Sequence, residues 1–304
     1  MADAAGLKIC VIGLGSMGLG IAGTLLRHGF AVTGCDVSPD AVTRFAGLGG
    51  RAASDPAAAA SGADVVVCVV VNAAQTETVL FGPQGAAAQM AHGGVILSCA
   101  TMAPDAARAF EAQAQALRIQ YIDAPVSGGA ARAAAGEMTI MASGAPAAFD
   151  RVRPVLDAIA AKVHELGDTA GTGAAFKIVN QLLAGVHIAA ACEAMTFAAA
   201  MGLDLARVYE VITASAGNSW MFENRVPHIL DGDYAPRSAV DIFTKDLGIV
   251  TDIGRGMKFP TPVASMALQM FVMTAAAGMG RDDDASVARM IAGLAGLDLP
   301  GAKT

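Results

Sequence analysis

Near its start the chain reads Leu7-Lys8-Ile9-Cys10-Val11-Ile12-Gly13-Leu14-Gly15-Ser16-Met17-Gly18. A nearly continuous apolar run leads into a loop with three glycines, and a helical pattern of apolar residues then extends to His28. The run predicts a buried strand, and the glycines predict a tight turn into the helix, because glycine adopts backbone angles that other residues resist. A second apolar run, Phe30 to Asp36, completes a strand, helix, strand unit.

The spacing of Gly13, Gly15 and Gly18 between a strand and a helix predicts a site for the pyrophosphate of a dinucleotide. The first glycine makes the turn, the second lets backbone N–H groups approach the phosphates, and the third allows the helix to pack closely on the strand. The helix dipole also favours an anion at this end. We therefore expect cofactor contacts in the loop residues Gly13, Leu14, Gly15, Ser16, Met17 and Gly18.

Asp36 ends the second strand, where a carboxylate can accept hydrogen bonds from the hydroxyls of the adenosine ribose. The same carboxylate would repel a 2′-phosphate, and no Arg or Lys stands in the following Val37-Ser38-Pro39. The sequence therefore predicts NAD rather than NADP as the cofactor. In the alternative interpretation, the glycines make only a tight turn and Asp36 caps the helix that starts at Pro39.

Strand and helix patterns continue to alternate as far as Ser143. This alternation predicts an α/β fold, with an N-terminal Rossmann-type, doubly wound parallel sheet that binds ligands at the carboxyl ends of its strands. The further strands are expected at 63–71, 94–99, 119–124 and 137–143, with helices after Asn72 and from Pro104.

From about Gly171 the pattern changes to long apolar helical stretches. We expect residues 1–170 to form the NAD-binding domain and residues 171–304 an all-helical domain for substrate binding and dimerisation. The first helix of this second domain runs from near Ala174 to about Ala200, which is unusually long for a globular protein. We expect it to link the domains and to pack against a partner subunit in a homodimer or homotetramer.

Composition excludes several classes of protein. The net charge is −7 and no basic cluster is present, which argues against a nucleic-acid partner. The five cysteines form no C-x-x-C pair, which indicates a reduced, metal-free chain. No basic segment leads into an apolar one at the start, so a cytoplasmic location is expected. The longest purely apolar stretches fall short of the ~20 residues that span a bilayer, so no membrane partner is expected.

Four motifs in order resemble the β-hydroxyacid dehydrogenase family, which includes 3-hydroxyisobutyrate, tartronate semialdehyde and 6-phosphogluconate enzymes. They are the glycine loop 13–18, Asp123-Ala124-Pro125-Val126-Ser127-Gly128-Gly129, Gly171-Thr172-Gly173-Ala174-Ala175-Phe176-Lys177-Ile178-Val179-Asn180-Gln181 and Lys245-Asp246-Leu247. Two further stretches, residues 71–77 and 215–227, look like the L-threonate dehydrogenase branch of that family.

The resemblance implies a role for each matching position. Lys177 is the expected catalytic residue. Ser127, Gly128 and Gly129 hold the substrate carboxylate, and Asn180 and Gln181 also bind the substrate, with Asn180 orienting it toward the lysine. The remaining cofactor contacts are expected at Val71, Asn72, Thr101 and Lys245. The chain departs from the family pattern at Ala100, where a serine is usual, and at Gln181, where a second asparagine is usual.

Oxidation of an alcohol requires a base for the hydroxyl proton while a hydride leaves carbon. A free lysine has a pKa near ~10.4, so burial and the charge of oxidised nicotinamide must lower the pKa of Lys177 before it can act. Helical spacing favours a shared face for Lys177 and four residues after it: Asn180, Gln181, Ala184 and His187. Decarboxylating relatives carry a glutamate where Ala184 stands, so we expect plain oxidation. The alternative is a solvated lysine at the start of a helix.

The expected reaction is oxidation of a small hydroxy acid, most specifically L-threonate, to its 2-oxo acid. Two alternatives stay open: another chemistry of the family (3-hydroxyisobutyrate oxidation or tartronate semialdehyde reduction), and a non-catalytic NAD-binding protein. Trp220, Phe222, Asn224 and Arg225 either close over the substrate or pack the second domain. The run of three aspartates at 282–284 lacks the spacing of a metal site and is expected to cap the helix from Ala285.

Overall fold

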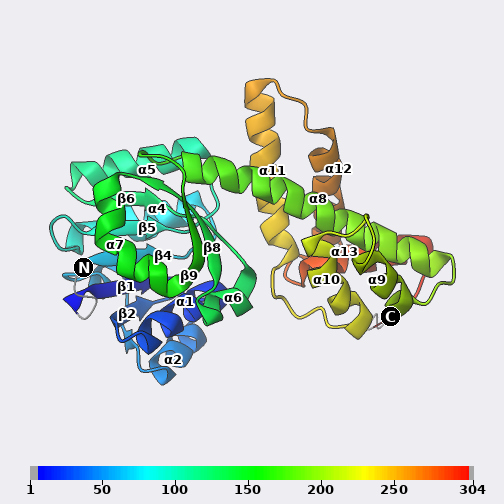
Figure 1. Ribbon diagram of the computed structural model, residues 1–304, viewed down its shortest axis with the longest axis horizontal. Helices are drawn as coiled ribbons and strands as arrows, with labels where there is room; N and C mark the ends of the chain where they lie inside the picture. Colours follow the sequence, from blue (N-terminus) through cyan, green and yellow to red (C-terminus); the bar gives the residue numbers. More distant parts are fainter. Residues whose placement is uncertain (1–5, 301–304) are drawn as a thin grey trace. The chain divides into compact units, whose positions relative to one another are not determined.

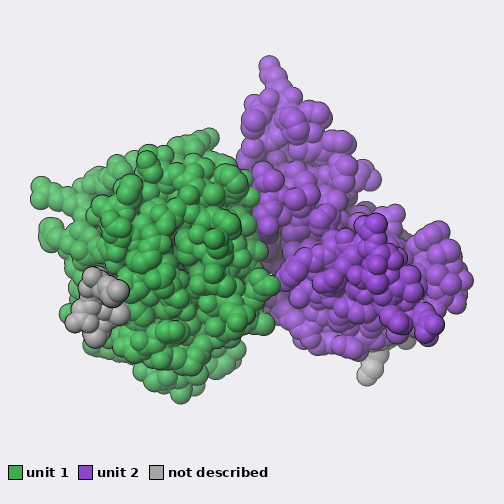
Figure 2. Space-filling view, viewed as in Figure 1, with its two compact units in different colours: residues 1–177 green, residues 178–304 purple. Residues whose placement is uncertain are grey.

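The computed structural model describes residues 6–300 (Figure 1). The chain divides into two compact units, residues 1–177 and 178–304, which Figure 2 colours separately. The division falls inside one long helix, just after Lys177.

Unit 1 contains one sheet, whose strands follow the order β3-β2-β1-β4-β5-β6-β8-β7, with β9 paired to β8. The first six in the chain are parallel. The order turns back at β1, which lies between β2 and β4, and such a reversal opens a crevice at the carboxyl ends of the strands. The six strands are β1 (Lys8–Ile12), β2 (Ala31–Cys35), β3 (Arg51–Ala52), β4 (Val65–Cys68), β5 (Val95–Ser98) and β6 (Gln120–Asp123).

Helices cover both faces of this sheet. In β1, Ile9 and Val11 belong to one buried cluster, whereas Cys10 and Ile12 belong to another, as alternation along a strand requires. The first cluster includes residues of α1, α2, α6 and α7, and the second includes residues of α3, α4 and α5. The doubly wound arrangement is therefore confirmed. The helices are α1 (Ser16–Arg27), α2 (Pro39–Gly47), α3 (Pro56–Ala59), α4 (Ala73–Phe81), α5 (Pro104–Ala116), α6 (Gly129–Ala135) and α7 (Pro146–Ile159), with the short turn η2 (Ala87–Gln89).

One edge of the sheet differs from the expected parallel pattern. β8 (Met138–Gly144) runs antiparallel to β6, and β7 (Val126–Ser127) pairs antiparallel with β8. The short connection through β7 and α6 lets the chain turn back, whereas a parallel strand usually needs a longer crossover. β9 (Ala160–Glu165) then adds a strand parallel to β8 that the sequence pattern did not predict.

Unit 2 is helical among its described residues, as expected. The apolar faces of its helices surround a separate core that includes Ile188, Phe243 and Phe271. The helices are α8 (Thr172–Ala200), which begins in unit 1, α9 (Leu205–Thr213), α10 (Trp220–Asp231), α11 (Val240–Met257), α12 (Pro262–Thr274), η3 (Ala275–Met279), η4 (Asp284–Ser286) and α13 (Val287–Ala295).

Among residues 6–300, two helical segments are long and apolar enough to cross a membrane by length and composition alone. Thr172–Ala200 has a mean hydropathy of 1.6 and is 50% buried, and Pro262–Met279 has a mean hydropathy of 1.4 and is 22% buried. A buried core helix meets the same criteria. Because Pro262–Met279 is only 22% buried, most of its apolar surface is exposed in the single chain.

All five cysteines are free and buried. Burial raises the pKa of the thiols of Cys35 and Cys99 to about 12. It also raises the pKa values of the other three thiols well above their usual range, because the charged thiolate is disfavoured away from water.

Candidate active site

The glycine loop has the geometry that its sequence predicts. Gly13 has a φ of +91°, and a Cβ there would lie 2.3 Å from the Val69 carbonyl oxygen. A Cβ on Gly18 would lie 1.8 Å from the Gly13 carbonyl oxygen, so this glycine allows α1 to pack against the loop. A Cβ on Gly15 would meet nothing within 4 Å, and no side chain caps α1. The amide groups at the start of α1 thus fit an incoming pyrophosphate.

Asp36 lies directly after β2, beside this loop. Its two carboxylate oxygens accept hydrogen bonds from the backbone N–H groups of Leu14 (2.6 Å) and Ser38 (2.8 Å). The helix cap that the alternative interpretation assigned to Asp36 is instead made by the Ser38 side chain, which accepts from Ala41 N. Asp36 therefore holds the glycine loop, and each carboxylate oxygen retains a lone pair for a ribose hydroxyl.

The other cofactor positions expected in unit 1 follow the carboxyl ends of β4 and β5. Asn72 caps α4 by accepting from Gln75 N, and the Gln75 side chain accepts from Val71 N, each at 2.9 Å. Thr101 follows β5 and is half-buried. These residues share the edge of the sheet at which the glycine loop lies, since neighbouring parallel strands end together. Gln75 is a supporting residue that the sequence reasoning missed.

The expected carboxylate-binding loop connects β7 to α6. Gly128 and Gly129 have φ values of +135° and +75°, which explains why glycines occupy both positions. Helix α6, which follows this loop, packs closely on α1. A Cβ on Gly20 of α1 would lie only 2.8 Å from Ala134 N of α6. The hydroxyl of Thr24 in α1 also donates to the Ala133 carbonyl at 3.1 Å.

Lys177 lies in the second turn of α8 and is only 7% exposed. Its Nζ donates to the Val126 carbonyl oxygen at 2.8 Å. Val126 immediately precedes Ser127-Gly128-Gly129, so the structure brings the expected acid/base next to the expected carboxylate-binding loop. The alternative of a solvated surface lysine does not fit this burial.

The remaining predicted residues form a polar chain within unit 2. Asn180 Nδ2 donates to Gln181 Oε1 at 2.9 Å, and the Gln181 amide donates to Asp246, which is 1% exposed. Asp246 also pairs with Lys245 at 2.7 Å. Gln181 is only 6% exposed, and its amide oxygen accepts from Asn180. Gln181 therefore supports the side chain of Asn180. Sequence reasoning gave Asp246 no role, although it stands beside Lys245 in the quoted motif.

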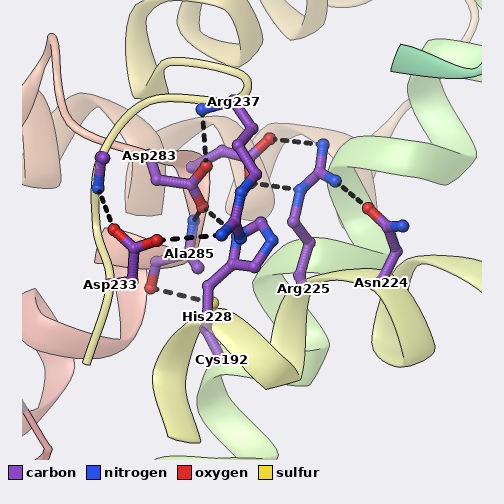
Figure 3. Close-up of polar contacts among 10 residues, drawn as sticks. Cys192, Asn224, Arg225, His228, Asp233, Arg237, Asp283 and Ala285 are labelled. Atoms are coloured by element: carbon purple, nitrogen blue, oxygen red, sulfur yellow. Dashed lines mark hydrogen bonds and ion pairs between the residues drawn. The ribbon is translucent and has the colours of Figure 1, made fainter. Parts of the chain in front are cut away.

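Arg225 takes part in a buried polar cluster (Figure 3). Its guanidinium pairs with both oxygens of Asp284, at 2.6 and 3.1 Å, and His228 Nδ1 lies 2.8 Å from Asp283 Oδ1. Asp283 also accepts from Ala285 N and so caps the short helix η4, which begins at Asp284. The expected cap is therefore found at this turn, whereas α13 begins only at Val287 and has no side-chain cap. These contacts favour the packing interpretation for Arg225. Phe222 likewise is buried and stacks on Tyr209, whereas Trp220 is 46% exposed.

A separate apolar hollow of about 790 Å³ lies in unit 2 between α8, α9 and the start of α10. His187 contributes to its wall, together with Ala194, Val211 and Phe222. The expected catalytic, substrate and cofactor residues are absent from its lining. Among residues 6–300, no three His, Cys, Asp or Glu side chains are arranged to hold a metal ion.

Comparison with known proteins agrees with this geometry. Residues 8–167 match the family model of the NAD binding domain of 6-phosphogluconate dehydrogenase. Residues 171–291 match the model described as the NAD-binding domain of NADP-dependent 3-hydroxyisobutyrate dehydrogenase. Together these models cover most of the chain.

The chain is 54% identical to L-threonate dehydrogenase of Cupriavidus necator, over 97% of this chain and 98% of that one. It is 47% identical to L-threonate dehydrogenase of Escherichia coli strain K12, over 97% of each chain. A crystal structure of 3-hydroxyisobutyrate dehydrogenase from Salmonella typhimurium has a TM-score of 0.89 at 49% identity, covering 93% of this chain and 99% of that one. The chain therefore belongs to the β-hydroxyacid dehydrogenase family that includes 3-hydroxyisobutyrate dehydrogenase, and it is a hydroxyacid oxidoreductase that uses NAD or NADP.

Proposed function

We propose that this enzyme oxidises L-threonate to the corresponding 2-oxo acid. The observation that carries the catalytic part is the position of Lys177, buried and hydrogen-bonded to the residue before Ser127-Gly128-Gly129. The choice of substrate is supported by relatives named L-threonate dehydrogenase at 46% to 54% identity.

In the proposed reaction, the Ser127 hydroxyl and the backbone N–H groups of Gly128 and Gly129 bind the substrate carboxylate. Lys177 Nζ accepts the proton of the reacting hydroxyl, and Asn180 orients the substrate. A bound nicotinamide supplies the acceptor for the hydride that leaves the same carbon. In the reverse direction the protonated lysine returns the proton to the carbonyl oxygen.

The product retains its carboxylate in this proposal. Ala184 lies seven residues, about two turns of α8, beyond Lys177. It is 5% exposed and packs in the core of unit 2. It has no group that could donate a proton to an enol intermediate. The reaction should therefore release no carbon dioxide.

We also propose a preference for NAD, supported by the Asp36 carboxylate beside the glycine loop. A ribose with free hydroxyls can donate to this carboxylate, whereas a 2′-phosphate would meet like charge. The positions proposed for cofactor contact are the glycine loop 13–18, Asp36, Val71, Asn72, Thr101 and Lys245.

Turnover of a panel of hydroxy acids with each cofactor tests this assignment. L-threonate with NAD should give the highest kcat/KM. The rival activity is 3-hydroxyisobutyrate oxidation, which is favoured by the name of the Salmonella typhimurium structure. Turnover of 3-hydroxyisobutyrate, or reduction of tartronate semialdehyde, in the absence of L-threonate turnover would overturn the substrate assignment.

A variant at Lys177 separates an enzyme from a non-catalytic NAD-binding protein. Lys177→Ala should lower kcat by ~100- to 10,000-fold, the usual contribution of a positioned acid/base. NADH affinity, measured by fluorescence, should change little. Full turnover in the variant would exclude Lys177 as the base.

We further propose that the protein is a homodimer or homotetramer, with residues 1–170 as the NAD-binding domain and residues 171–304 as the substrate and dimerisation domain. Exposed apolar side chains on α8, α9 and α12 support burial against a second copy; they include Phe197, Val211, Val263 and Met266. The five reduced, buried cysteines support a cytoplasmic location. Sedimentation at micromolar concentration should give a dimer or tetramer, and a monomer would contradict the oligomer.

A further inference from the structure

The first turn of α8 begins in a socket built by two strands of unit 1. Asp123 Oδ2 accepts hydrogen bonds from Gly171 N at 3.0 Å and from Ala174 N at 2.7 Å. The hydroxyl of Ser143 accepts from Gly173 N at 2.9 Å. These five residues, which we name the α8 socket, satisfy three backbone donors at the start of the helix. Such donors have no partner within a helix and need one from outside it.

The socket leaves little freedom for the helix. Asp123 and Ser143 are both 0% exposed and lie opposite one another in the antiparallel pair of β6 and β8. A Cβ on Gly173 would lie 2.4 Å from the Met141 carbonyl oxygen and 2.9 Å from that of Asp123. The helix therefore approaches the strands so closely that only glycine fits at this position.

Lys177 follows Ala174 by three residues and so lies less than one turn beyond the socket. Its Nζ donates to the carbonyl of Val126, which comes three residues after Asp123 on the same segment. That segment then continues into Ser127-Gly128-Gly129. One short piece of chain therefore fixes the start of α8, contacts the lysine ammonium and carries the proposed carboxylate-binding loop.

The carboxylate of Asp123 lies in the α8 socket although burial disfavours its charged form. Burial raises the pKa of Asp123 to about 6, even though the N–H groups of Ala174 and Gly171 and the Ser143 side chain favour the charged form. Glu111, which accepts from Ala170 N at 3.2 Å, adds a like charge nearby. A hydrophobic residue would avoid this cost but would leave buried N–H groups unsatisfied.

We propose that Asp123 and Ser143 are positioning residues that hold Lys177 against the loop Ser127-Gly128-Gly129. This inference rests on the catalytic role proposed for Lys177. Because a displacement of ~1 Å can reduce a rate by ~100-fold, loss of the socket should lower kcat far more than cofactor affinity.

Two buried serines in the strands on either side of β6, Ser143 and Ser98, provide a test substitution and its matched control. The Ser143 hydroxyl on β8 accepts a hydrogen bond from α8. Ser98 on β5, which is paired with Asp123 in register, makes no side-chain hydrogen bond to α8 among the described residues. Both side chains are fully buried. Ser143→Ala should lower kcat several-fold with an unchanged Kd for NADH, and Ser98→Ala should leave kcat unchanged.

Substitutions at Asp123 test the larger contribution. Asp123→Ala removes the acceptor for two N–H groups and should lower kcat by ~10- to 100-fold. Asp123→Asn keeps an amide oxygen that can replace Oδ2, so it should restore most of the lost kcat. Equal losses in the two variants would mean that the carboxylate does not act through these hydrogen bonds.

A double-mutant cycle identifies the target of the socket. If Asp123 and Ser143 act through Lys177, then Ser143→Ala and Asp123→Ala should cause no further loss of kcat in the Lys177→Ala background. Losses that persist in that background, or an equal loss in Ser98→Ala, would overturn the proposal. Full activity of Lys177→Ala alone would instead show that the proposed function has the wrong base, a distinct outcome. If Asp123→Ala does not fold, Ser143→Ala carries the same cycle.

Discussion

At the scale of single residues, the Asp36 carboxylate binds two backbone N–H groups and is also the proposed partner of the ribose. Because it bonds to Leu14 N, its removal should loosen the glycine loop for either cofactor. Total affinity alone therefore cannot report on the ribose contact. The ratio of the two affinities can, because only NADP carries the phosphate that the carboxylate would repel.

Asp36→Ala should weaken both NAD and NADP and should narrow the preference for NAD by about tenfold, the order of a hydrogen bond to a charged group. The measurement is the ratio of kcat/KM for the two cofactors. Asp40→Ala, a change to an exposed carboxylate in the first turn of α2, serves as the control and should leave the ratio unchanged. A wider preference in Asp36→Ala would contradict the ribose assignment.

Asp123 has a consequence for stability as well as for position. Its pKa is raised from an ordinary value of 3.8 to about 6 because burial disfavours the charge. The folded state therefore binds the proton more tightly than the unfolded state. The associated stability is fully present below pH 3.8 and is lost as the pH rises through about 6, a change of about 3 kcal/mol.

Asp123→Asn lacks this titration. Relative to the wild type, its free energy of unfolding should therefore increase as the pH rises from 4 to 7. Urea denaturation at the two pH values measures the difference, and the contributions of the other carboxyl groups cancel between the two proteins. A relative loss of stability for the variant with rising pH would contradict the raised pKa.

At the scale of elements, two neighbouring glycines at the start of α1 should affect different properties. Gly18 should affect the stability of the fold, and Gly15 the binding of the cofactor. Gly18→Ala places a Cβ 1.8 Å from the Gly13 carbonyl oxygen, so it should destabilise the protein by ~1–3 kcal/mol. Gly15→Ala adds a methyl group in open space at a φ of −63°, so it should change stability by less than ~0.5 kcal/mol.

Gly15→Ala should nevertheless raise the Kd for NADH by about tenfold, because the methyl group points to the space where the phosphates approach. Thermal unfolding and fluorescence titration of both variants check the two effects. Unchanged NADH affinity in Gly15→Ala would place the pyrophosphate elsewhere.

The same elements show what sequence can predict. The β1, α1, β2 unit was predictable because apolar periodicity and glycine spacing are local properties. β9 escaped prediction because its side chains are mostly exposed or half-buried and form no apolar run. The antiparallel direction of β8 depends on pairing with β6, which periodicity does not reveal.

Some residues of the candidate site could likewise be predicted from the sequence, and others could not. Family resemblance identified Lys177 and Ser127-Gly128-Gly129, and the structure brings the two together. Asp123 and Asp246 stood inside the quoted motifs but received no role. Their partners come from distant segments, so only the fold shows that these carboxylates are buried and bonded.

At the scale of the whole molecule, unit 2 is held together by ion pairs as well as by its apolar core. Arg225 on α10 and Asp284 in η4 are 11% and 0% exposed, and their pair joins segments 59 residues apart. Removing one partner leaves a buried charge uncompensated, which usually costs ~3–5 kcal/mol.

Arg225→Met should therefore destabilise the protein by about 3 kcal/mol or more at pH 7. The loss should shrink toward pH 5, because burial already raises the pKa of Asp284 to about 6 and the protonated acid needs no cation. Arg237→Met, which removes an ion pair with side chains 50% and 45% exposed, is the control and should cost less than ~1 kcal/mol. Equal losses in the two variants, measured by urea denaturation, would contradict this view of the cluster.

The native cysteines should not react with thiol reagents in the folded protein, which is useful for labelling experiments. Since the thiolate is the species that reacts with alkylating reagents, thiols that are buried and have raised pKa values should remain unlabelled while the protein is folded. A cysteine introduced at exposed Leu48 in unit 1, with another at exposed Leu294 in unit 2, should then take up dye or spin label alone. The distance between the two labels can then be measured in solution without first removing any native cysteine.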